Sequence, residues 1–277
     1  MPELPEVETI AADVRPHLLG ARIARARVLK PDILRGVGRP AFERSVTGRL
    51  IASVERRAKH LVIRLDDGKR IVIQPRMTGA LLVDRAGFEV RGARDPYDVI
   101  ELHLDSGARV HYRDVRRLGA VFLLTPRAWV RYDAAIGPEP LEPSFTPERF
   151  AAILRTGRLA VKKAIMDQRR LAGVGNIYAS EALWAAGLDP SRAASTVRPA
   201  EAARLHAAIV DVLRRSIAGR GTTVRDYRTG TGEPGEFQGR LAVYGRSGEP
   251  CLQCGTRITL THAIDARATY FCHRCQH

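Results

Sequence analysis

Apolar residues recur with two different periods along this chain. In the first twenty residues they recur every three or four positions, which is the spacing of one face of a helix. This pattern predicts a helix over residues 3–19, ended by Gly20, that buries one apolar stripe and carries the N-terminus at its start. The positions that define the stripe are Leu4, Val7, Ile10, Val14 and Leu18.

Residues 24–112 follow a period of two. Short segments alternate apolar with polar positions, and turn-forming residues separate several of them, as at 66–68 and 105–107. Alternation over short segments at this spacing is typical of an antiparallel sandwich or barrel. We therefore expect an antiparallel β-sandwich after the leading helix, with strands within 24–28, 50–54, 61–65, 71–73, 100–104 and 110–112.

The pattern changes once more near residue 136, where glycine and three prolines mark a linker. Helical spacing follows, with Thr146 as the expected N-cap of the first helix and Pro147 at its first position. A stretch with six glycines, 219–239, predicts a functional loop. The fold class expected is α+β, with an N-terminal domain over 1–135, a linker over 136–145, a helical domain over 146–240 and a cysteine-bearing segment over 241–277.

The net charge of the chain indicates which kind of partner it binds. The chain has 45 Lys and Arg against 30 Asp and Glu, a formal net charge of +15. Such an excess indicates a polyanion partner, most simply nucleic acid, although a generally arginine-rich composition would give the same number. No apolar run is long enough to span a membrane, and the N-terminus lacks a secretory signal, so we expect an intracellular protein.

The four cysteines have the spacing of a metal site. Cys251-x2-Cys254 and Cys272-x2-Cys275 are separated by 17 residues. This pattern predicts one structural zinc ion bound by four thiolates in a hairpin, because four protein ligands leave no open position for catalysis. Two disulfides or four reduced thiols are the alternatives.

The extreme N-terminus is a candidate nucleophilic site. Removal of Met1 would expose the secondary amine of Pro2, and an α-amine titrates far below lysine. Such an amine can attack an electrophilic carbon, and Glu3 and Glu6, on one helix face, can shuttle protons beside it. The alternative is an ordinary helix start, at which proline and acids are common.

A second candidate site is the turn at 173–181, where Gly173 and Gly175 bracket a turn that leads directly into a helix. Such a turn presents backbone N–H groups and the side chain of Asn176 to an anion, which is how a helix start binds phosphate. A plain turn between two helices would look similar.

Together these motifs resemble the formamidopyrimidine-DNA glycosylase family. The opening at residues 1–9, Arg56-Arg57-Ala58-Lys59, residues 173–181, Val243-Tyr244-Gly245-Arg246 and the four cysteines occur in the family's order over essentially the whole chain. The resemblance implies a β-sandwich domain, a helix–two-turn–helix domain and a zinc finger. It also implies a monomer that binds double-stranded DNA with damaged bases in the bacterial cytoplasm.

The resemblance also implies residue roles. Pro2 is the nucleophile toward C1′ of the damaged nucleotide, Glu3 the general acid/base and Glu6 its support, with no catalytic metal or redox cofactor. Extruding a base from the stack leaves a hole, which wedge residues fill. The implied wedges are Met77 and Leu118, with Arg116 facing the orphaned base. The implied phosphate contacts are Lys59, Asn176 and Arg267, and Lys59 also counts among the catalytic residues. Lys162 lies near the damaged base, and 219–239 caps the lesion.

Three departures from the family pattern affect the substrate more than the reaction. Leu118 replaces the usual phenylalanine wedge, Gln74 and Pro75 replace His-Leu, and the loop at 222–237 differs at most positions. The leading hypothesis is a glycosylase and lyase for oxidised purines. The alternatives are an endonuclease VIII-like glycosylase for oxidised pyrimidines and a non-catalytic lesion-binding protein.

Overall fold

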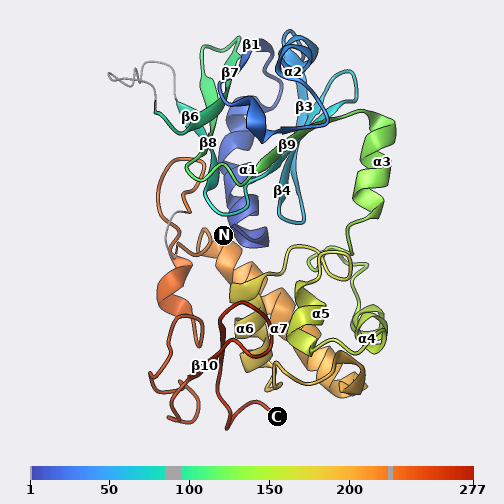
Figure 1. Cartoon of the computed structure of the whole chain (residues 1–277), viewed down its shortest axis with the longest axis vertical. Coiled ribbons are helices and arrows are strands. Elements are labelled where there is room, and N and C mark those ends of the chain that lie inside the picture. The colour runs from blue at the N-terminus through green and yellow to red at the C-terminus, as the bar shows by residue number, and fades with distance from the viewer. Residues whose placement is uncertain (1, 85–94, 224–226) are drawn as a thin grey trace. The chain divides into compact units, whose positions relative to one another are not determined.

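The computed structural model describes residues 2–84, 95–223 and 227–277. The chain forms two compact units (Figure 1). Unit 1 comprises Met1–Ala134 and Gly219–Glu236, and unit 2 comprises Ala135–Ala218 and Phe237–His277. The chain therefore leaves unit 1, returns to it for one short segment, and then completes unit 2.

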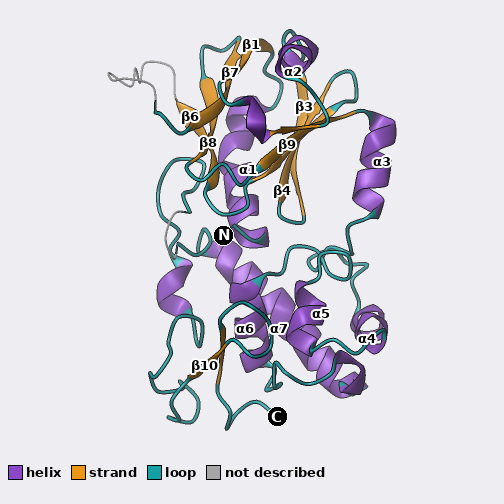
Figure 2. Ribbon diagram, viewed as in Figure 1, coloured by secondary structure: helices purple, strands orange, loops and turns teal. Residues whose placement is uncertain are grey.

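Two sheets form the body of unit 1 (Figure 2). Within the described residues, the first has the strand order β1-β7-β8-β6 with antiparallel pairing throughout. The second has the order β2-β9-β5-β4-β3, in which β2 and β9 pair parallel and the other neighbours antiparallel. The predicted sandwich is confirmed; its strands are β1 (Ile23–Val28), β2 (Leu34–Arg35), β3 (Ile51–Arg57), β4 (His60–Leu65), β5 (Arg70–Gln74), β6 (Gly79–Asp84), β7 (Asp98–Leu104), β8 (Arg109–Asp114) and β9 (Ala120–Leu124).

Helix α1 (Leu4–Leu18) begins at the predicted place for a local reason. Glu3 and Glu6 form a capping box, and Pro5 lies in the first turn, where its missing N–H costs nothing. The five predicted stripe positions are all buried. The helix is therefore fixed along its whole length, including the turn that carries the candidate nucleophile.

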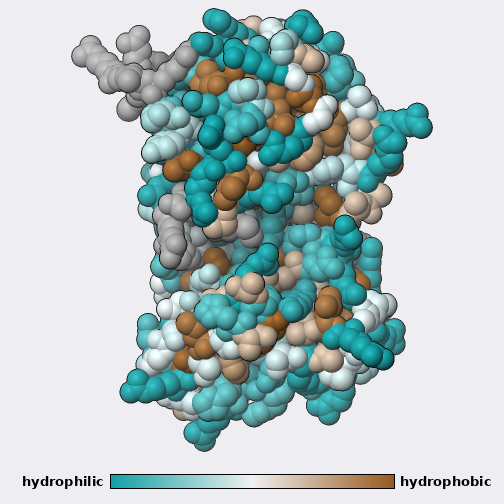
Figure 3. Space-filling model, in the orientation of Figure 1, coloured by the Kyte–Doolittle hydropathy of each residue, from teal (hydrophilic) through white to brown (hydrophobic). Residues whose placement is uncertain are grey.

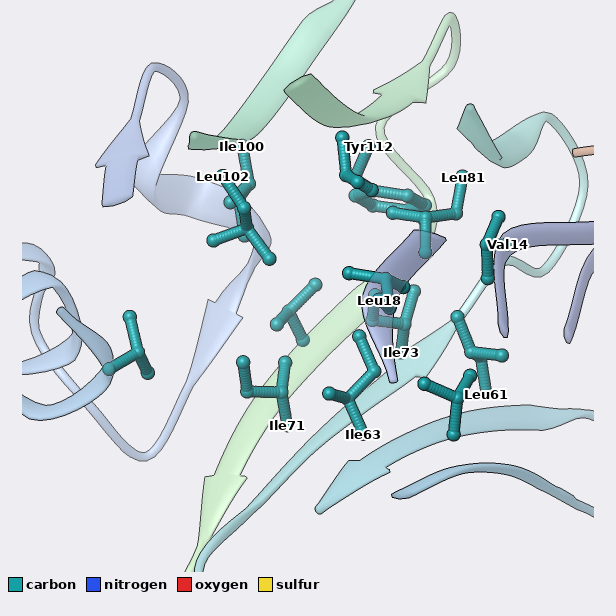
Figure 4. Packing of buried hydrophobic residues seen from close by; sticks show 14 of the residues in the cluster. Val14, Leu18, Leu61, Ile63, Ile71, Ile73, Leu81, Ile100, Leu102 and Tyr112 are labelled. Carbon is teal, nitrogen blue, oxygen red and sulfur yellow. The ribbon is translucent and has the colours of Figure 1, made fainter. Parts of the chain in front are cut away.

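The core of unit 1 combines one face of α1 with the inner faces of both sheets. Each large aliphatic side chain buried there contributes about 1.5–3 kcal/mol relative to exposure, so α1 is held by many such contacts. Figure 4 shows this packing for Val14, Leu18, Leu61, Ile63, Ile71, Ile73, Leu81, Ile100, Leu102 and Tyr112.

Several elements of unit 1 were not predicted by the periodicity. Strands β6 and β9 are nearly continuous apolar runs, Gly-Ala-Leu-Leu-Val and Ala-Val-Phe-Leu-Leu, in which no alternation is visible. Helix α2 (Arg39–Val46) has two buried residues, Phe42 and Val46. In α3 (Pro126–Ala134), all of which the structure describes, no residue is fully buried. Short elements with so few buried positions leave no clear period in the sequence.

Unit 2 is built from four α-helices within its described residues. Thr146 caps the first of them by accepting the N–H of Arg149 at 3.3 Å, as predicted. Short 3-10 turns and a two-stranded hairpin complete the unit. Its helices and strands are α4 (Pro147–Arg155), α5 (Val161–Met166), α6 (Asn176–Ala185), α7 (Pro199–Ala218), β10 (Thr259–Thr261) and β11 (Thr269–Phe271).

The glycine-rich segment departs from the expected domain division. We expected it within the helical domain, but Gly219–Glu236 packs with unit 1. Tyr227, at 4% exposure, joins the core cluster of the sandwich, and an isolated bridge pairs Thr222 with Glu236. The segment is thus attached to the unit that carries Pro2.

The surface is mostly polar. Figure 3 shows hydrophilic residues over most of the viewed face, interrupted by small hydrophobic patches. Among residues 2–84, 95–223 and 227–277, no helix combines the length and apolar character needed to cross a membrane.

Candidate active site and DNA interface

The first turn of α1 gathers the three residues predicted to perform the chemistry. Pro2, Glu3 and Glu6 are buried, and each glutamate is 1% exposed. One carboxylate oxygen of Glu6 accepts the N–H of Glu3 at 2.8 Å, and the other accepts the N–H of Thr222 at 2.8 Å. Two oriented carboxylates within one turn of Pro2 fit proton transfer beside a reacting amine. Met1, whose removal frees that amine, lies outside the described residues.

Lys59 lies in the turn of the β3–β4 hairpin, where it is half-buried. The two preceding arginines attach this hairpin to helices. Arg56 Nε donates to Glu8 of α1 at 2.9 Å, and Arg57 Nε donates to Asp133 of α3 at 2.5 Å. The motif around Lys59 is thus anchored on both sides. The predicted phosphate contact of Lys59 stays a prediction.

The two predicted wedge residues, and the arginine predicted to face the orphaned base, all lie at the surface of unit 1. Met77 is 38% exposed and Leu118 is 44% exposed. Arg116 is exposed as well. Exposed apolar side chains on turns suit insertion into a base stack, the role that the family resemblance implies.

One buried carboxylate, Asp114, joins the two turns that carry these wedges. It accepts the hydroxyl of Thr78 at 2.5 Å and the N–H of Gly119 at 2.8 Å. It also accepts the N–H of Arg117 at 3.1 Å, while Thr78 Oγ1 accepts the N–H of Arg116 at 3.0 Å. This role of Asp114 was not predicted; its position directly before the exposed turn was the available signal in the sequence.

Gln74, which departs from the family pattern, is engaged inside unit 1. Its Nε2 donates to the hydroxyl of Tyr132 on α3 at 2.7 Å, and that hydroxyl lies 3.3 Å from Nδ1 of His60. Burial raises the pKa of Tyr132, so the phenol stays neutral near pH 7. Gln74 therefore links the end of β5 to α3.

In unit 2, three predicted residues converge on the hairpin turn between β10 and β11. The side-chain amide of Asn176, at the start of α6, donates to Ala268 O at 2.9 Å. The fully buried Lys162 donates to Thr269 Oγ1 at 2.6 Å and to Ala268 O at 3.3 Å. Arg267 precedes this point and is exposed. Contacts of Lys162 with a base, and of Asn176 and Arg267 with phosphate, stay predictions.

Glu181 connects two motifs that lie more than sixty residues apart in the sequence. Its carboxylate, on α6, accepts three successive backbone N–H groups, from Ala242 at 2.7 Å, Val243 at 2.9 Å and Tyr244 at 2.8 Å. Glu181 is 5% exposed. It therefore fixes the start of the cysteine-bearing segment on α6, a role that its place in the 173–181 motif did not indicate.

We expect Glu181→Ala to destabilise unit 2 by about 2–4 kcal/mol, because three donors lose one charged acceptor and two of them are buried. Thermal or urea unfolding of the whole chain measures this change. Glu142→Ala removes an exposed glutamate of the same unit and is the matched control. Equal stability of the two variants would contradict the role of Glu181.

The four cysteines form one cluster. Their ligand atoms all lie within 4.8 Å of one another, with Cys251 Sγ 3.9 Å from Cys275 Sγ and Cys254 Sγ 3.5 Å from Cys272 Sγ. All four are free thiols, so the disulfide alternative is not supported. The described residues contain no second group of this kind.

The donor set fits a tetrahedral thiolate site. Zn–S bonds of about 2.3 Å place tetrahedral sulfurs about 3.8 Å apart, close to the distances observed. Burial and the neighbouring thiols raise the pKa of Cys275, and a cation between the sulfurs would favour its thiolate form. Trp184 Nε1 donates to Cys251 Sγ at 3.4 Å, an outer hydrogen bond of the kind that orients metal ligands.

Comparisons with known proteins cover both units. The family model for the formamidopyrimidine-DNA glycosylase N-terminal domain matches residues 1–121, and the model for the H2TH domain of the same enzyme matches residues 136–228. A formamidopyrimidine-DNA glycosylase of Paracoccus denitrificans is 41% identical over the full length of both chains. One from Chloroflexus aggregans is 42% identical over 100% of this chain and 98% of its own.

Solved structures agree. Wild-type Lactococcus lactis Fpg bound to DNA containing N7-benzyl-Fapy-dG matches with a TM-score of 0.90 and 29% identity over 99% of each chain. MutM bound to DNA containing carbocyclic 8-oxo-G matches with a TM-score of 0.90 and 30% identity, again over 99% of each chain. Sequence, domain order and fold therefore agree, and the chain belongs to the formamidopyrimidine-DNA glycosylase family.

Proposed function

We propose that this protein is a bifunctional DNA glycosylase and abasic-site lyase that removes oxidised purines from double-stranded DNA. The observation that carries the proposal is the buried first turn of α1, where Pro2 and two oriented carboxylates lie together. Membership of the family supports the same activity. The enzyme acts as a monomer in the bacterial cytoplasm, where its DNA substrate is.

The chemistry follows from the residues at this turn. The free Pro2 nitrogen attacks C1′ of the damaged nucleotide, and the bond from C1′ to the base breaks with its electron pair leaving on the base. The departing base takes up one proton, which balances the N–H proton that the Pro2 nitrogen gives up. Glu3 supplies a proton at the sugar ring as the ring opens, and an iminium joins Pro2 to C1′. The iminium acidifies the C2′ proton; a carboxylate removes it, and the 3′ phosphate leaves, followed by the 5′ phosphate.

The remaining predicted residues serve binding. Lys59, Asn176 and Arg267 contact phosphates, Lys162 lies near the damaged base, and Met77, Arg116 and Leu118 occupy the space that the extruded nucleotide leaves. The net charge of +15 supports this assignment of a polyanionic partner. The turns joined by Asp114 hold the wedges in register with one another.

The cysteine cluster binds one zinc ion in this proposal. Zinc when bound would cross-link the hairpin and hold Arg267 on a rigid turn; it takes no part in the reaction. The sulfur distances and the hydrogen bond from Trp184 support zinc as the occupant.

Borohydride trapping on a panel of duplexes tests the function and its substrate class. Matched duplexes carry 8-oxoguanine, a formamidopyrimidine, an oxidised pyrimidine or a preformed abasic site. We expect a covalent complex with the two oxidised purines and the abasic site, and at least tenfold slower trapping with the oxidised pyrimidine, because one site discriminates bases by its hydrogen bonds.

Each alternative predicts a different result on this panel. Faster trapping on the oxidised pyrimidine would favour the endonuclease VIII-like activity, for which Leu118 in place of the usual wedge is the motivating residue. Tight binding to lesions with no trapped complex on any duplex would favour a non-catalytic lesion-binding protein.

A further inference from the structure

The segment Gly219–Glu236 is bonded to one side chain of α1 at two points. Near its start, Arg220 Nη2 donates to the carboxylate of Asp13, at 3.1 Å and 2.9 Å to the two oxygens. Ten residues later, the N–H of Gly230 donates to Oδ2 of the same carboxylate at 2.9 Å. The Asp13 side chain is 10% exposed, so these bonds form in a partly desolvated place.

The backbone at both contact points suits this arrangement. Arg220 has a φ of 55°, a left-handed conformation that favours glycine. Gly230 admits no side chain, because a Cβ there would lie 2.6 Å from Asp13 Cβ and 3.1 Å from Val14 Cγ1. Its carbonyl accepts the N–H of Val83 in β6 at 3.3 Å, which fixes its other side.

The fastened segment reaches the catalytic end of the helix. Asp13 lies two helical turns after Glu6, so the two side chains share one face of α1. Two residues after Arg220, the N–H of Thr222 donates to Glu6 Oε1. The hydroxyl of Tyr227 lies 3.3 Å from Glu6 O and 3.1 Å from Arg220 O, and burial, with the charge of Glu6, raises its pKa.

We propose that Asp13 and Arg220 are a positioning pair for base excision. The pair fixes the start of the segment on α1, the fixed segment holds the Thr222 N–H against Glu6, and Glu6 is thereby oriented beside Glu3 and Pro2. This inference rests on the proposed function for its consequence on rate. Its structural claim, that the pair holds Thr222 on Glu6, is independent of catalysis.

The first test is kinetic and uses Arg220→Gly, Asp13→Asn and the double variant in the full chain. Glycine accepts the φ of residue 220, so we expect Arg220→Gly to fold with an unchanged melting temperature. Single-turnover excision of the oxidised purine should fall about 10–100-fold in each single variant, as for a displaced catalytic group. Affinity for a duplex with an uncleavable abasic analogue should stay within twofold, and Arg220→Lys should restore part of the rate.

Coupling and a matched control sharpen this test. If the two residues act as one pair, the double variant excises no more slowly than the slower single variant. Arg49→Gly removes another arginine–aspartate contact of unit 1, with Asp67 at 3.4 Å, and should leave excision unchanged. The proposal would be overturned if both single variants excised the base at the wild-type rate. It would also be overturned if the rate losses of the single variants multiplied in the double variant, or if DNA affinity and melting temperature fell in parallel with the rate.

The second test needs no activity. Hydrogen exchange of the Thr222 amide should become at least tenfold faster in Asp13→Asn and Arg220→Gly, while amides in the β4–β5 pair keep their protection. Unchanged exchange at Thr222 would overturn the positioning pair. If wild type forms no covalent complex with any duplex, the proposed function fails, and this measurement still decides whether the pair holds Thr222 on Glu6.

Discussion

Pro2→Gly should give no borohydride-stable complex with a damaged duplex under conditions that trap the wild-type chain. Proline supplies a secondary amine, whose iminium at C1′ has no N–H proton to lose and stays cationic, whereas the iminium formed by the primary amine of glycine can lose its N–H proton and become a neutral imine. Glycine also removes a ring that is buried at the start of α1 and fixes the direction of the nitrogen. Denaturing gels after borohydride treatment measure the trapped fraction.

Two controls separate the amine from the helix that carries it. His17→Gln changes a half-buried side chain near the end of α1 and should trap at the wild-type rate. A chain shown by mass spectrometry to retain Met1 has its Pro2 nitrogen in a peptide bond and should trap nothing. Efficient trapping by the Met1-retaining form would show that a different group, such as Lys59, is the nucleophile.

The sequence predicted best where one element carries its own signals. Helix α1 has a five-position stripe and a capping box, and the helix after Thr146 has a side-chain cap with proline in its first turn. Both were placed correctly because caps and periodicity are local. Strand β9 was missed because a short apolar run does not distinguish a buried strand from part of a buried helix.

The candidate site was also predictable where its contacts are local and not where they join residues far apart in the sequence. The cysteine spacing predicted one cluster, since two tight turns must each supply two ligands. Asp114 and Glu181 accept backbone N–H groups from other parts of the chain. The spacing of residues in the sequence does not reveal such contacts. Lys162 illustrates the point further, since its bonds reach a hairpin 106 and 107 residues away.

The attachment of Gly219–Glu236 to unit 1 was the least predictable feature. Its glycines and polar residues indicated a loop, and position in the sequence suggested the helical domain. Its partners Glu6 and Asp13 lie more than 200 residues earlier, and the contacts use single side chains and backbone groups rather than a periodic pattern. Only the folded arrangement shows that this segment and Pro2 share one unit.

Removing zinc from the whole protein should abolish binding to duplex DNA, with a loss of at least about 100-fold in affinity, while unit 1 stays folded. Metal binding supplies about 10–16 kcal/mol to small four-ligand zinc domains, so the hairpin with Arg267 loses its order without it. The sandwich has its own core, which shares no buried residue with the cluster around the cysteines. Fluorescence anisotropy measures affinity, and protection of the sandwich amides from hydrogen exchange reports on unit 1.

Two matched variants separate the effect of losing a metal ligand from the effect of changing a neighbouring residue. Cys254→Ser should lower the bound zinc from one ion per chain and reproduce the loss of DNA affinity, because serine oxygen is a poor ligand where thiolate is required. His273→Ala removes an exposed potential ligand between Cys272 and Cys275 and should keep both the zinc and the affinity. Zinc added back to the chelated wild type should restore binding. Undiminished DNA affinity in the metal-free protein would show either that Arg267 and its turn are not part of the DNA interface or that the bonds from Lys162 and Asn176 hold the turn without the metal.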